Sequence, residues 1–239
     1  MGSQVLSGFE KGDAMKAAAI IVSFDHWHND QYGDGSWARE FAHNLQRLNP
    51  TMKVLVVDNA SRIPYTSETL DIIHLGKRCG YGEALNHGLM HLQVQGGFDW
   101  YVTLNNDCQI KTGTNGDVVR VLETLSPNTL YGSGVNRDTR LTFAWQWSAW
   151  MCISAKIFQQ VGYFDERLAA AFEDFDYQRR AMDMDFGLDF ADLPIEHLDM
   201  HTRYEDRDYP KRWEAARLLF ETKHKISMMS WYTQEEINR

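Results

Sequence analysis

The chain has 239 residues, of which 44% are hydrophobic and 24% charged, a balance typical of globular proteins and unlike that of disordered or fibrous ones. Its 24 basic and 33 acidic residues give a net charge of −9, which excludes a general attraction to nucleic acid or anionic membranes. The net charge does not exclude a local basic groove. The three cysteines are too few for a disulfide framework and form no CxxC motif. We therefore expect a cytoplasmic protein.

Residues Met1–Ala14 carry Gly and Ser, are mixed in charge and show no periodicity, so we expect a leader or flexible arm there. No repeat or low-complexity linker divides the remainder. We expect one domain over residues 15–205 and a helical extension of the same domain over residues 206–239. The longest apolar run, Ala17–Val22, is far shorter than the roughly 18–20 residues of a membrane helix, so no transmembrane segment is expected.

Short apolar runs alternate with helical patterns from Met15 onward. Strands are predicted at Ala17–Phe24, Lys53–Asp58, Asp71–Leu75, Trp100–Leu104 and Met151–Ser154, and a β-like segment at Phe190–Ile195. Helical spacing predicts helices over Ser36–Leu48 and Glu83–Leu92, and another that carries Val118 to Leu125 and is closed by Pro127. Strands that alternate with helices are typical of an α/β, Rossmann-like fold, with a mostly parallel sheet flanked by helices.

Polar residues directly follow three of these strands. They are Asp25, Asp58-Asn59 and Asn105-Asn106-Asp107. Each alone fits a turn, which Asp and Asn favour. However, parallel strands end along one sheet edge, where α/β proteins bind their ligands. Carboxylates and amides gathered there would hold a ribose, a base edge and a metal–diphosphate, and their oxygens suit Mg²⁺ or Mn²⁺.

Two common nucleotide-binding motifs, GxxxxGK[ST] and a GxGxxG at the first helix, are absent. The nearest feature is Gly80-Tyr81-Gly82, which follows Lys77-Arg78 and precedes a predicted helix. These glycines either let the backbone approach a ligand or form a plain turn. A nucleotidyltransferase is disfavoured because Ser23–Gly35, directly after the first strand, carries no Lys or Arg.

Five sequence blocks follow one another from about Ala17 to Thr202. They are Val57–Ser61 (VDNAS), Gly80–Gly88 (GYGEALNHG), Leu104–Asp107 (LNND), Gly162–Arg180 with its GYFDE and FEDFDY runs, and His197 with Thr202. In this order and spacing they resemble family 2 glycosyltransferases of the GT-A fold, of the rhamnosyltransferase- and galactofuranosyltransferase-like kind. The resemblance implies a nucleotide-sugar donor (a UDP- or dTDP-sugar), a divalent metal (Mn²⁺ or Mg²⁺) and inversion at the anomeric carbon.

The resemblance also implies roles for individual residues. It assigns metal binding to Asp107 and His197, and His201 replaces His197 if the match to the family's histidine block shifts. It assigns donor binding to Ser23, Asp25, Asp58, Asn59, Arg78, Gly80, Asn86, Asn105 and Asn106. Two positions depart from the family pattern. Asn105-Asn106-Asp107 replaces D-x-D and keeps one carboxylate, and Arg78 stands where relatives often have Asn.

The run Glu173-Asp174-x-Asp176 is the one dense carboxylate cluster in an otherwise apolar region. By resemblance, Asp174 is the general base that takes a proton from the acceptor hydroxyl, and Glu173 orients or contacts the acceptor. The residues alone also fit an acidic helix start that the helix dipole favours. In that interpretation Asp176 pairs with Arg180, four residues further on.

The acceptor side is expected to include Trp145, Trp147 and Asp176. Together with Trp150, these tryptophans form a dense aromatic cluster, and such rings usually lie in the core. The polar residues between them favour one ring, Trp145 or Trp147, that faces the cleft. A long helix is predicted over Pro210–Trp231.

The basic residues of this C-terminal stretch form either a solvated face or a docking strip for an anionic acceptor such as a lipid diphosphate, a membrane surface or DNA. They are Lys211, Arg212, Arg217, Lys223, His224 and Lys225. The acceptor itself stays open between a polysaccharide, a glycolipid and another hydroxyl, and a peripheral position at the inner membrane face fits such a strip. A glycosyltransferase acting on a modified base in phage DNA is an alternative that the charge of −9 disfavours. A catalytically weak nucleotide-sugar-binding relative is another, because the Asn-Asn-Asp motif is reduced.

Overall fold

The computed structural model describes residues 14–24, 36–61, 64–133, 135–136, 145–146, 149–198 and 208–226. The strands are β1 (Ala17–Ser23), β2 (Lys53–Asp58), β3 (Asp71–His74), β4 (Trp100–Asn105), β5 (Cys108–Ile110), β6 (Thr129–Gly132), β7 (Val135–Asn136), β8 (Trp145–Gln146), β9 (Trp150–Ser154), β10 (Gly187–Phe190) and β11 (Ile195–His197). The helices are α1 (Ser36–Leu48), α2 (Tyr81–Val94), α3 (Val118–Leu122), α4 (Ala155–Val161), α5 (Glu173–Met182) and α6 (Tyr209–His224).

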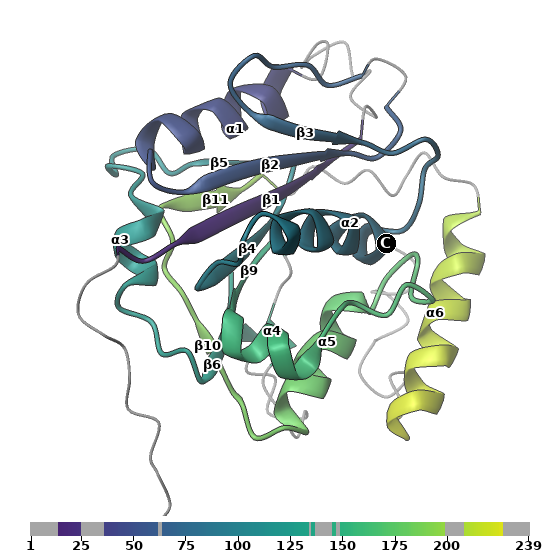
Figure 1. The fold of residues 1–239 in the computed structure, drawn as a ribbon. Coiled ribbons are helices and arrows are strands. Elements are labelled where there is room, and N and C mark those ends of the chain that lie inside the picture. Colours follow the sequence, from purple (N-terminus) through teal and green to yellow (C-terminus); the bar gives the residue numbers. More distant parts are fainter. Residues whose placement is uncertain are drawn as a thin grey trace, which may run out of the picture.

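A seven-stranded sheet, in the order β10-β6-β9-β4-β1-β2-β3, forms the centre of the fold (Figure 1). β1 runs parallel to β2 and β4, β2 runs parallel to β3, and β6 runs parallel to β10. Only β9 among the strands of this sheet runs antiparallel to its neighbours, β4 and β6. The sequence-based prediction of a mostly parallel α/β sheet is therefore confirmed.

Helices cover both faces of this sheet (Figure 1). Every residue of β1 is buried, and its successive side chains enter two separate cores. Ile21 packs with residues of α1 and α3 on one face, and Ile20 packs with residues of α2 and α4 on the other. At Gly88 of α2 a Cβ atom would lie 2.8 Å from Cγ2 of Ile20, so only glycine lets this helix lie so close to the sheet.

The predicted β-like segment at Phe190–Ile195 is instead the end of one strand and the start of another. β10 ends at Phe190, and β11 begins at Ile195 and pairs with β5 in a separate two-stranded sheet. Pro194 lies at this break, and because proline has no N–H it cannot continue a strand ladder as a donor. Its carbonyl accepts a hydrogen bond from the backbone N–H of Lys111 at 3.0 Å, which directs the chain towards β5.

Three predicted helices have different bounds in the structure. α2 covers Tyr81–Val94 and is longer at both ends than the predicted Glu83–Leu92. α3 ends at Leu122, before the predicted Leu125, and its first turn is capped by Asp117, whose side chain accepts a hydrogen bond from the N–H of Arg120. α6 covers Tyr209–His224, and the rest of the predicted helix after residue 226 lies outside the described residues.

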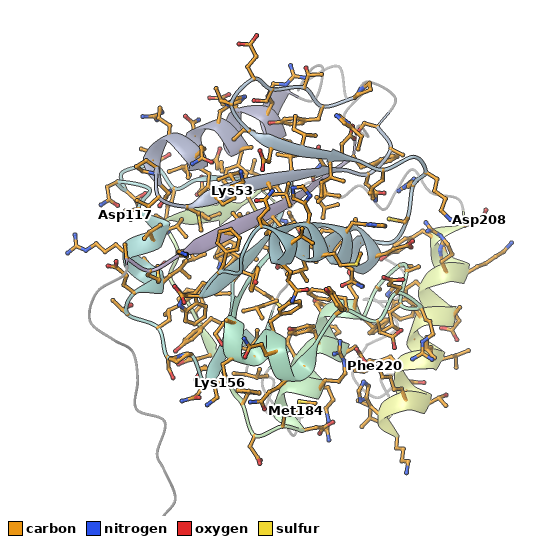
Figure 2. All side chains as sticks on the ribbon, in the orientation of Figure 1. Lys53, Asp117, Lys156, Met184, Asp208 and Phe220 are labelled. Atoms are coloured by element: carbon orange, nitrogen blue, oxygen red, sulfur yellow. The ribbon has the colours of Figure 1, made fainter. Side chains whose placement is uncertain are left out.

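α6 packs against α5 and the segment that precedes it. Phe220 is fully buried and points from α6 into the body of the domain (Figure 2). Its ring stacks on Phe172, with the ring centroids 5.6 Å apart, and Trp213 packs on the same ring. In the part of the chain that the structure describes, no helix is both long enough and apolar enough to cross a membrane.

Candidate active site

The parallel strands end side by side, as the sequence predicts. In the sheet register Ser23 of β1 pairs with Asp58 of β2, and Asp58 pairs with His74 of β3. On the other side of β1, Val22 pairs with Asn105 of β4. The polar residues that follow β2 and β4 therefore share one edge of the sheet. Asp25 lies outside the described residues.

Asp58 is buried at this edge and organises the chain that follows it. Its carboxylate accepts hydrogen bonds from the N–H groups of Ser61 and Tyr65, both at 3.1 Å, and contacts Nδ1 of His74 at 2.9 Å. Burial alone would raise the pKa of Asp58, but the hydrogen bonds from Ser61, His74 and Tyr65 outweigh it and hold the pKa below its usual value. A contact between Asp58 and a nucleoside stays a prediction.

Asn59 joins the end of β2 to the loop before α2. Its side chain donates to the carbonyl of Cys79 and accepts from the N–H of Cys79, both at 3.0 Å. The neighbouring Arg78 is exposed, and its guanidinium lies 4.0 Å from the ring centroid of Phe24, directly after β1. This contact places a cation at the strand-end edge, where the sequence predicts donor binding.

The glycines of the Gly80-Tyr81-Gly82 turn permit close packing. A Cβ on Gly80 would lie 2.8 Å from Cα of Ala169, and one on Gly82 would lie 3.3 Å from Cβ of Glu173. The start of α2 therefore lies directly against the start of α5. This is a packing requirement, and a contact between Gly80 and a donor stays a prediction.

Asn86 ties α2 to the GYFDE run. Its amide donates to the carbonyl of Phe164 and to Glu166, both at 3.0 Å, and its Oδ1 accepts from the N–H of Phe164 at 2.9 Å. These contacts occupy both polar atoms of a side chain that is buried. The predicted role of Asn86 in donor binding is untested beside this positioning role.

The antiparallel pairing of β5 with β11 places His197 beside Asp107. Cys108 pairs with His197, and the N–H of Leu198 donates to the carbonyl of Asp107 at 2.9 Å. Nε2 of His197 lies 3.0 Å from Oδ1 of Asp107. The carboxylate is largely buried, and the imidazole remains partly exposed.

The chemistry of this pair fits a divalent cation such as Mn²⁺. A carboxylate oxygen and an imidazole nitrogen are both ligands for such ions, and phosphates of a substrate commonly complete the shell. Among the described residues no group of three or more His, Cys, Asp or Glu side chains is placed to hold a metal. Asn105 and Asn106, in the same turn, are half-buried.

The carboxylates of α5 begin at a strained residue. Phe172, directly before the helix, has a left-handed backbone conformation with φ of 69°, which is unusual for a bulky residue and tends to persist only where the surroundings enforce it. Here the aromatic contacts with Phe220 and Trp213 hold Phe172 in place. The packing of α6 therefore fixes the position at which Glu173 and Asp174 enter the helix.

Glu173 and Asp174 lie in different environments. Oε2 of Glu173 is buried and has no hydrogen-bond partner among the described residues. Burial, and secondarily the charge of Asp174, raises the pKa of Glu173 to about 8. Oδ1 of Asp174 accepts from the N–H of Phe175 at 2.8 Å, within the first turn of α5. Of the two carboxyl groups, that of Glu173 is therefore the one that burial favours in the protonated form near neutral pH.

Tyr81 is a residue of the candidate site that the sequence-based predictions did not include. It is the first residue of α2, and its hydroxyl is buried without a hydrogen-bond partner in the described part of the chain. Burial raises its pKa well above the usual value, and further contributions come from Cys108, Glu173, Asp107 and Asp174. Tyr81 therefore lies within electrostatic range of both the Asp107 turn and the α5 carboxyls. An isolated tyrosine beside two glycines carried no signal of this position.

Asp176 is fully buried and paired with cations. It accepts from Nε of Arg180 at 2.8 Å, from Nζ of Lys223 at 2.6 Å and from Nε2 of His224 at 2.8 Å. The predicted pairing of Asp176 with Arg180 is present, and α6 supplies the other two partners. A direct contact of Asp176 with an acceptor would require α6 to move, and it stays a prediction.

The basic residues of α6 do not all face solvent. Lys223 also pairs with Asp165 at 2.7 Å, and His224 is held by Asp176. Arg217 is buried between Glu214 and Glu221. Of the predicted acceptor-side tryptophans, Trp147 lies outside the described residues, and for Trp145 only its place in β8 is described.

Comparison with known proteins finds similarity in fold, but not in sequence. No protein-family profile matches the sequence, and no curated protein matches it. A mannosyltransferase from Pyrobaculum calidifontis, solved with GDP-Man and Mn²⁺, has a TM-score of 0.52 at 13% identity, covering 73% of this chain and 54% of that one. The fold is of the GT-A type.

Another solved structure is also similar. The catalytic domain of Drosophila β1,4-galactosyltransferase 7, solved with xylobiose, has a TM-score of 0.46 at 11% identity, covering 81% of this chain and 74% of that one. This chain spans about half the length of the mannosyltransferase, with 54% of that protein covered. At these identities the likeness concerns the arrangement of helices and strands.

Proposed function

We propose that this protein is a metal-dependent, inverting glycosyltransferase that moves a sugar from a nucleotide-sugar donor to an acceptor hydroxyl. One observation carries the proposal. Asp107, in the turn after β4, contacts His197 of β11 at the same sheet edge as Asp58, and the start of α5, which carries Glu173 and Asp174, packs against the Gly80–Gly82 turn. Such a gathering of ligand and acid–base groups at the carboxyl edge of a parallel sheet is typical of a substrate site.

The donor would lie along the edge formed by β1, β2 and β4. Asp58 and His74 would face the nucleoside, and Arg78 and the Asn105–Asp107 turn would face the diphosphate. Asp107 and His197 would hold Mn²⁺ or Mg²⁺. When bound, the ion supplies positive charge that stabilises the departing nucleoside diphosphate. The fold neighbour from Pyrobaculum binds GDP-Man with Mn²⁺, and we propose a UDP- or dTDP-sugar as the donor here.

Asp174 would act as the general base. An inverting transfer requires one group that accepts the proton of the attacking hydroxyl, and it requires no enzyme nucleophile. A carboxyl that stays protonated near neutral pH, as burial favours for Glu173, is poorly suited to accept that proton. It can instead donate a hydrogen bond and orient the acceptor. Asp174, its neighbour at the start of α5, is left as the proton acceptor.

The acceptor would be a polysaccharide, a glycolipid or another hydroxyl compound. The internal pairing of Arg217, Lys223 and His224 removes three members of the basic strip that would draw the protein to DNA or a membrane. A free hydroxyl on a carbohydrate therefore fits the described surface better than an acceptor that needs a strongly basic docking face. We propose a cytoplasmic location for the reaction.

A panel of nucleotide sugars with Mn²⁺ or Mg²⁺ tests the proposal. Ligands that bind the folded state raise the melting temperature, so a true donor should stabilise the protein with metal and lose this effect with EDTA. Incubation with simple glycosides as acceptors should release free nucleoside diphosphate. Stabilisation without any release, across all acceptors and in hydrolysis, would favour a catalytically weak nucleotide-sugar-binding protein. No stabilisation by any nucleotide sugar would contradict the proposal.

A further inference from the structure

The left-handed backbone at Phe172 lies directly before the two carboxyls at the start of α5. Its φ is 69° and its ψ is 1°. Bulky residues rarely adopt this conformation, and where they do, the surrounding structure enforces it. The carbonyl of Phe172 accepts a helical hydrogen bond from the N–H of Asp176 at 2.8 Å. The conformation of this one residue therefore sets the direction in which Glu173 and Asp174 leave the backbone.

The ring of Phe172 packs against α6. It stacks on Phe220 with the ring centroids 5.6 Å apart and the ring planes at 22°, and Trp213 packs on it at 5.3 Å. Phe172 and Phe220 belong, with Leu168 and Ala216, to a hydrophobic cluster separate from the two cores that flank the sheet. This cluster therefore fastens α6 to the residue before α5 and not to the sheet.

Lys223, three residues after Phe220, fixes how α6 lies along α5. Its ammonium contacts Asp165 at 2.7 Å and the fully buried Asp176 at 2.6 Å. A buried ion pair can specify one arrangement of two elements among several alternatives. These pairs therefore select the turn of α6 that meets α5, and this turn carries the ring of Phe220.

The start of α5 also packs against α2. A Cβ atom on Gly82 would lie 3.3 Å from Cβ of Glu173 and 3.1 Å from Cβ of Phe164. Oε2 of Glu173 is buried in this contact region. Because α2 and α6 both touch the start of α5, a change in the backbone at Phe172 would move the carboxyls relative to α2.

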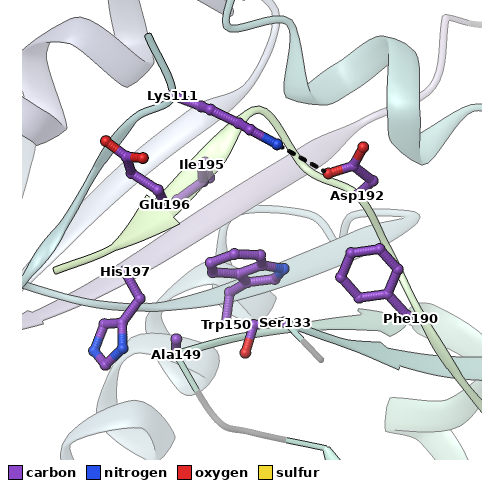
Figure 3. A pocket seen from close by; sticks show the side chains of 9 residues that line it. All are labelled: Lys111, Ser133, Ala149, Trp150, Phe190, Asp192, Ile195, Glu196 and His197. Carbon is purple, nitrogen blue, oxygen red and sulfur yellow. Dashed lines mark ion pairs between the residues drawn. The ribbon is translucent and has the colours of Figure 1, made fainter. Parts of the chain in front are cut away.

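The cavity beside the proposed metal pair is formed by other elements. Its volume is about 510 Å³, and its lining includes Trp150, Phe190 and His197 (Figure 3). None of the described residues that line it belongs to α5 or α6. A change at Phe220 should therefore leave this cavity and the adjoining Asp107–His197 pair intact, and any effect on the reaction should arise at the start of α5.

We propose that Phe220 is a positioning residue for the general base. It holds the ring of Phe172, this ring maintains the left-handed backbone, and the backbone places the Asp174 carboxylate where it accepts the proton of the acceptor hydroxyl. Misplacement of a reacting group by about 1 Å can slow a reaction by about 10²-fold, even when the substitution lies far from the chemistry. The inference rests on the proposed glycosyl transfer, since that reaction assigns the proton to Asp174.

Phe220→Leu tests this role through turnover, because it keeps an apolar side chain and removes the ring. Turnover of the nucleotide sugar should fall by about 10- to 100-fold, while donor affinity stays nearly unchanged. Phe41→Leu is the matched control, since Phe41 is also a buried phenylalanine of a helix and its core contains no residue of α5 or α6. It should lower the melting temperature to a similar extent and leave turnover nearly unchanged.

The carboxyl of Glu173 reports the place of the α5 start independently of turnover. In protein labelled with ¹³C at the glutamate carboxyls, its NMR signal is identified by its loss in Glu173→Gln. Burial raises the pKa of Glu173 to about 8, and the described titratable groups in electrostatic range are Asp174 and Tyr81. In Phe220→Leu this carboxyl should gain solvent, and its pKa should fall towards the usual 4.5. In Phe41→Leu the pKa should stay as in the wild type.

A double-mutant cycle shows whether Phe220 acts through Phe172. Phe172→Gly removes the ring, and glycine adopts a positive φ without steric cost. In this background Phe220→Leu has no ring to release, so it should change turnover much less than it does in the wild type. An equal effect of Phe220→Leu in both backgrounds would overturn the inference.

The outcomes distinguish this inference from the proposed function. Transfer by the wild type together with an unchanged Glu173 titration in Phe220→Leu would overturn the positioning role alone, and so would equal losses of turnover in Phe220→Leu and Phe41→Leu. Absence of transfer by the wild type would contradict the proposed function, and the Glu173 titration then still decides whether Phe220 places the start of α5. If Phe220→Leu does not fold, Trp213→Phe in the same aromatic contact should shift the titration in the same direction.

Discussion

Nε2 of His197 and Oδ1 of Asp107 lie 3.0 Å apart although the residues are 90 positions apart in the chain. The antiparallel pairing of β5 with β11 brings them together, and this small sheet stands beside the main seven-stranded sheet. The Asn-Asn-Asp turn keeps a single carboxylate, and we propose that the histidine at its side is a second ligand of the ion. The pair is therefore the element of the site on which metal binding should depend.

Asp107→Ala should abolish the metal-dependent part of nucleotide stabilisation. The variant removes one of two protein ligands that we propose for the ion, so UDP with Mn²⁺ should raise the melting temperature no more than UDP with EDTA. Asp185→Asn, an exposed acid on the turn after α5, is the control and should behave as the wild type. Nucleotide stabilisation that is indifferent to both EDTA and Asp107→Ala would remove the metal assignment.

Asp58→Ala should weaken free nucleotide and the full donor by the same factor, because we propose that Asp58 faces the nucleoside that both share. The variant also leaves the N–H groups of Ser61 and Tyr65 without their acceptor, so we expect a loss of about 1–3 kcal/mol in the free energy of unfolding. Isothermal titration well below the melting temperature separates the two effects. A loss of affinity confined to the sugar-bearing donor would place Asp58 near the sugar.

Much of the fold was predictable because strand and helix patterns are local. The buried strands at Ala17–Ser23 and Lys53–Asp58 are nearly continuous apolar runs, and their polar ends predicted the shared edge that the register confirms. The break at Pro194 was not predicted, because the apolar residues on both sides of the proline read as one segment. The antiparallel direction of β9 was not predicted either, since periodicity does not encode strand direction.

The features of the candidate site that the sequence does not predict depend on contacts between segments that are distant in the chain. The buried hydroxyl of Tyr81 and the left-handed backbone of Phe172 depend on packing from several elements, which no single motif reveals. The donor-binding roles of Asn59 and Asn86 stay predictions, and the structure shows in addition that their amides join loops and helices of this chain. The roles of Asp174, Asp107 and His197 stay predictions that rest on resemblance and are compatible with the geometry.

Glu173→Gln should change how stability depends on pH. In the folded protein the pKa of Glu173 is raised to about 8, against 4.5 in the unfolded chain. Between these values the unfolded chain ionises and the folded state does not, so this group lowers the free energy of unfolding as the pH rises from about 4.5 to 8. The variant lacks this effect. Its melting temperature relative to the wild type should therefore rise from pH 5 to pH 8, and a difference that is constant with pH would contradict the assigned environment.

Asp176→Asn should destabilise the protein strongly. Asp176 is the buried partner of Arg180, Lys223 and His224, and removal of one member of a buried ion pair costs about 3–5 kcal/mol. Asp183→Asn, at the residue that caps the C-terminal end of the same helix, is the matched control. Its exposed pair with Arg179 should contribute at most about 1 kcal/mol. Urea unfolding measures both, and similar losses for the two variants would contradict the role of Asp176 in anchoring α6.

The central claim is that Asp174 is the general base, and Asp174→Asn tests it most directly. The substitution keeps the size of the side chain and removes the proton acceptor. Turnover of the donor identified by the nucleotide-sugar panel should fall by roughly 10²–10⁴-fold, the usual effect of losing a general base. Donor affinity, measured by the melting-temperature shift, should stay nearly unchanged. Near-normal turnover in Asp174→Asn, with Glu173→Gln inactive, would move the base to Glu173 and contradict the account.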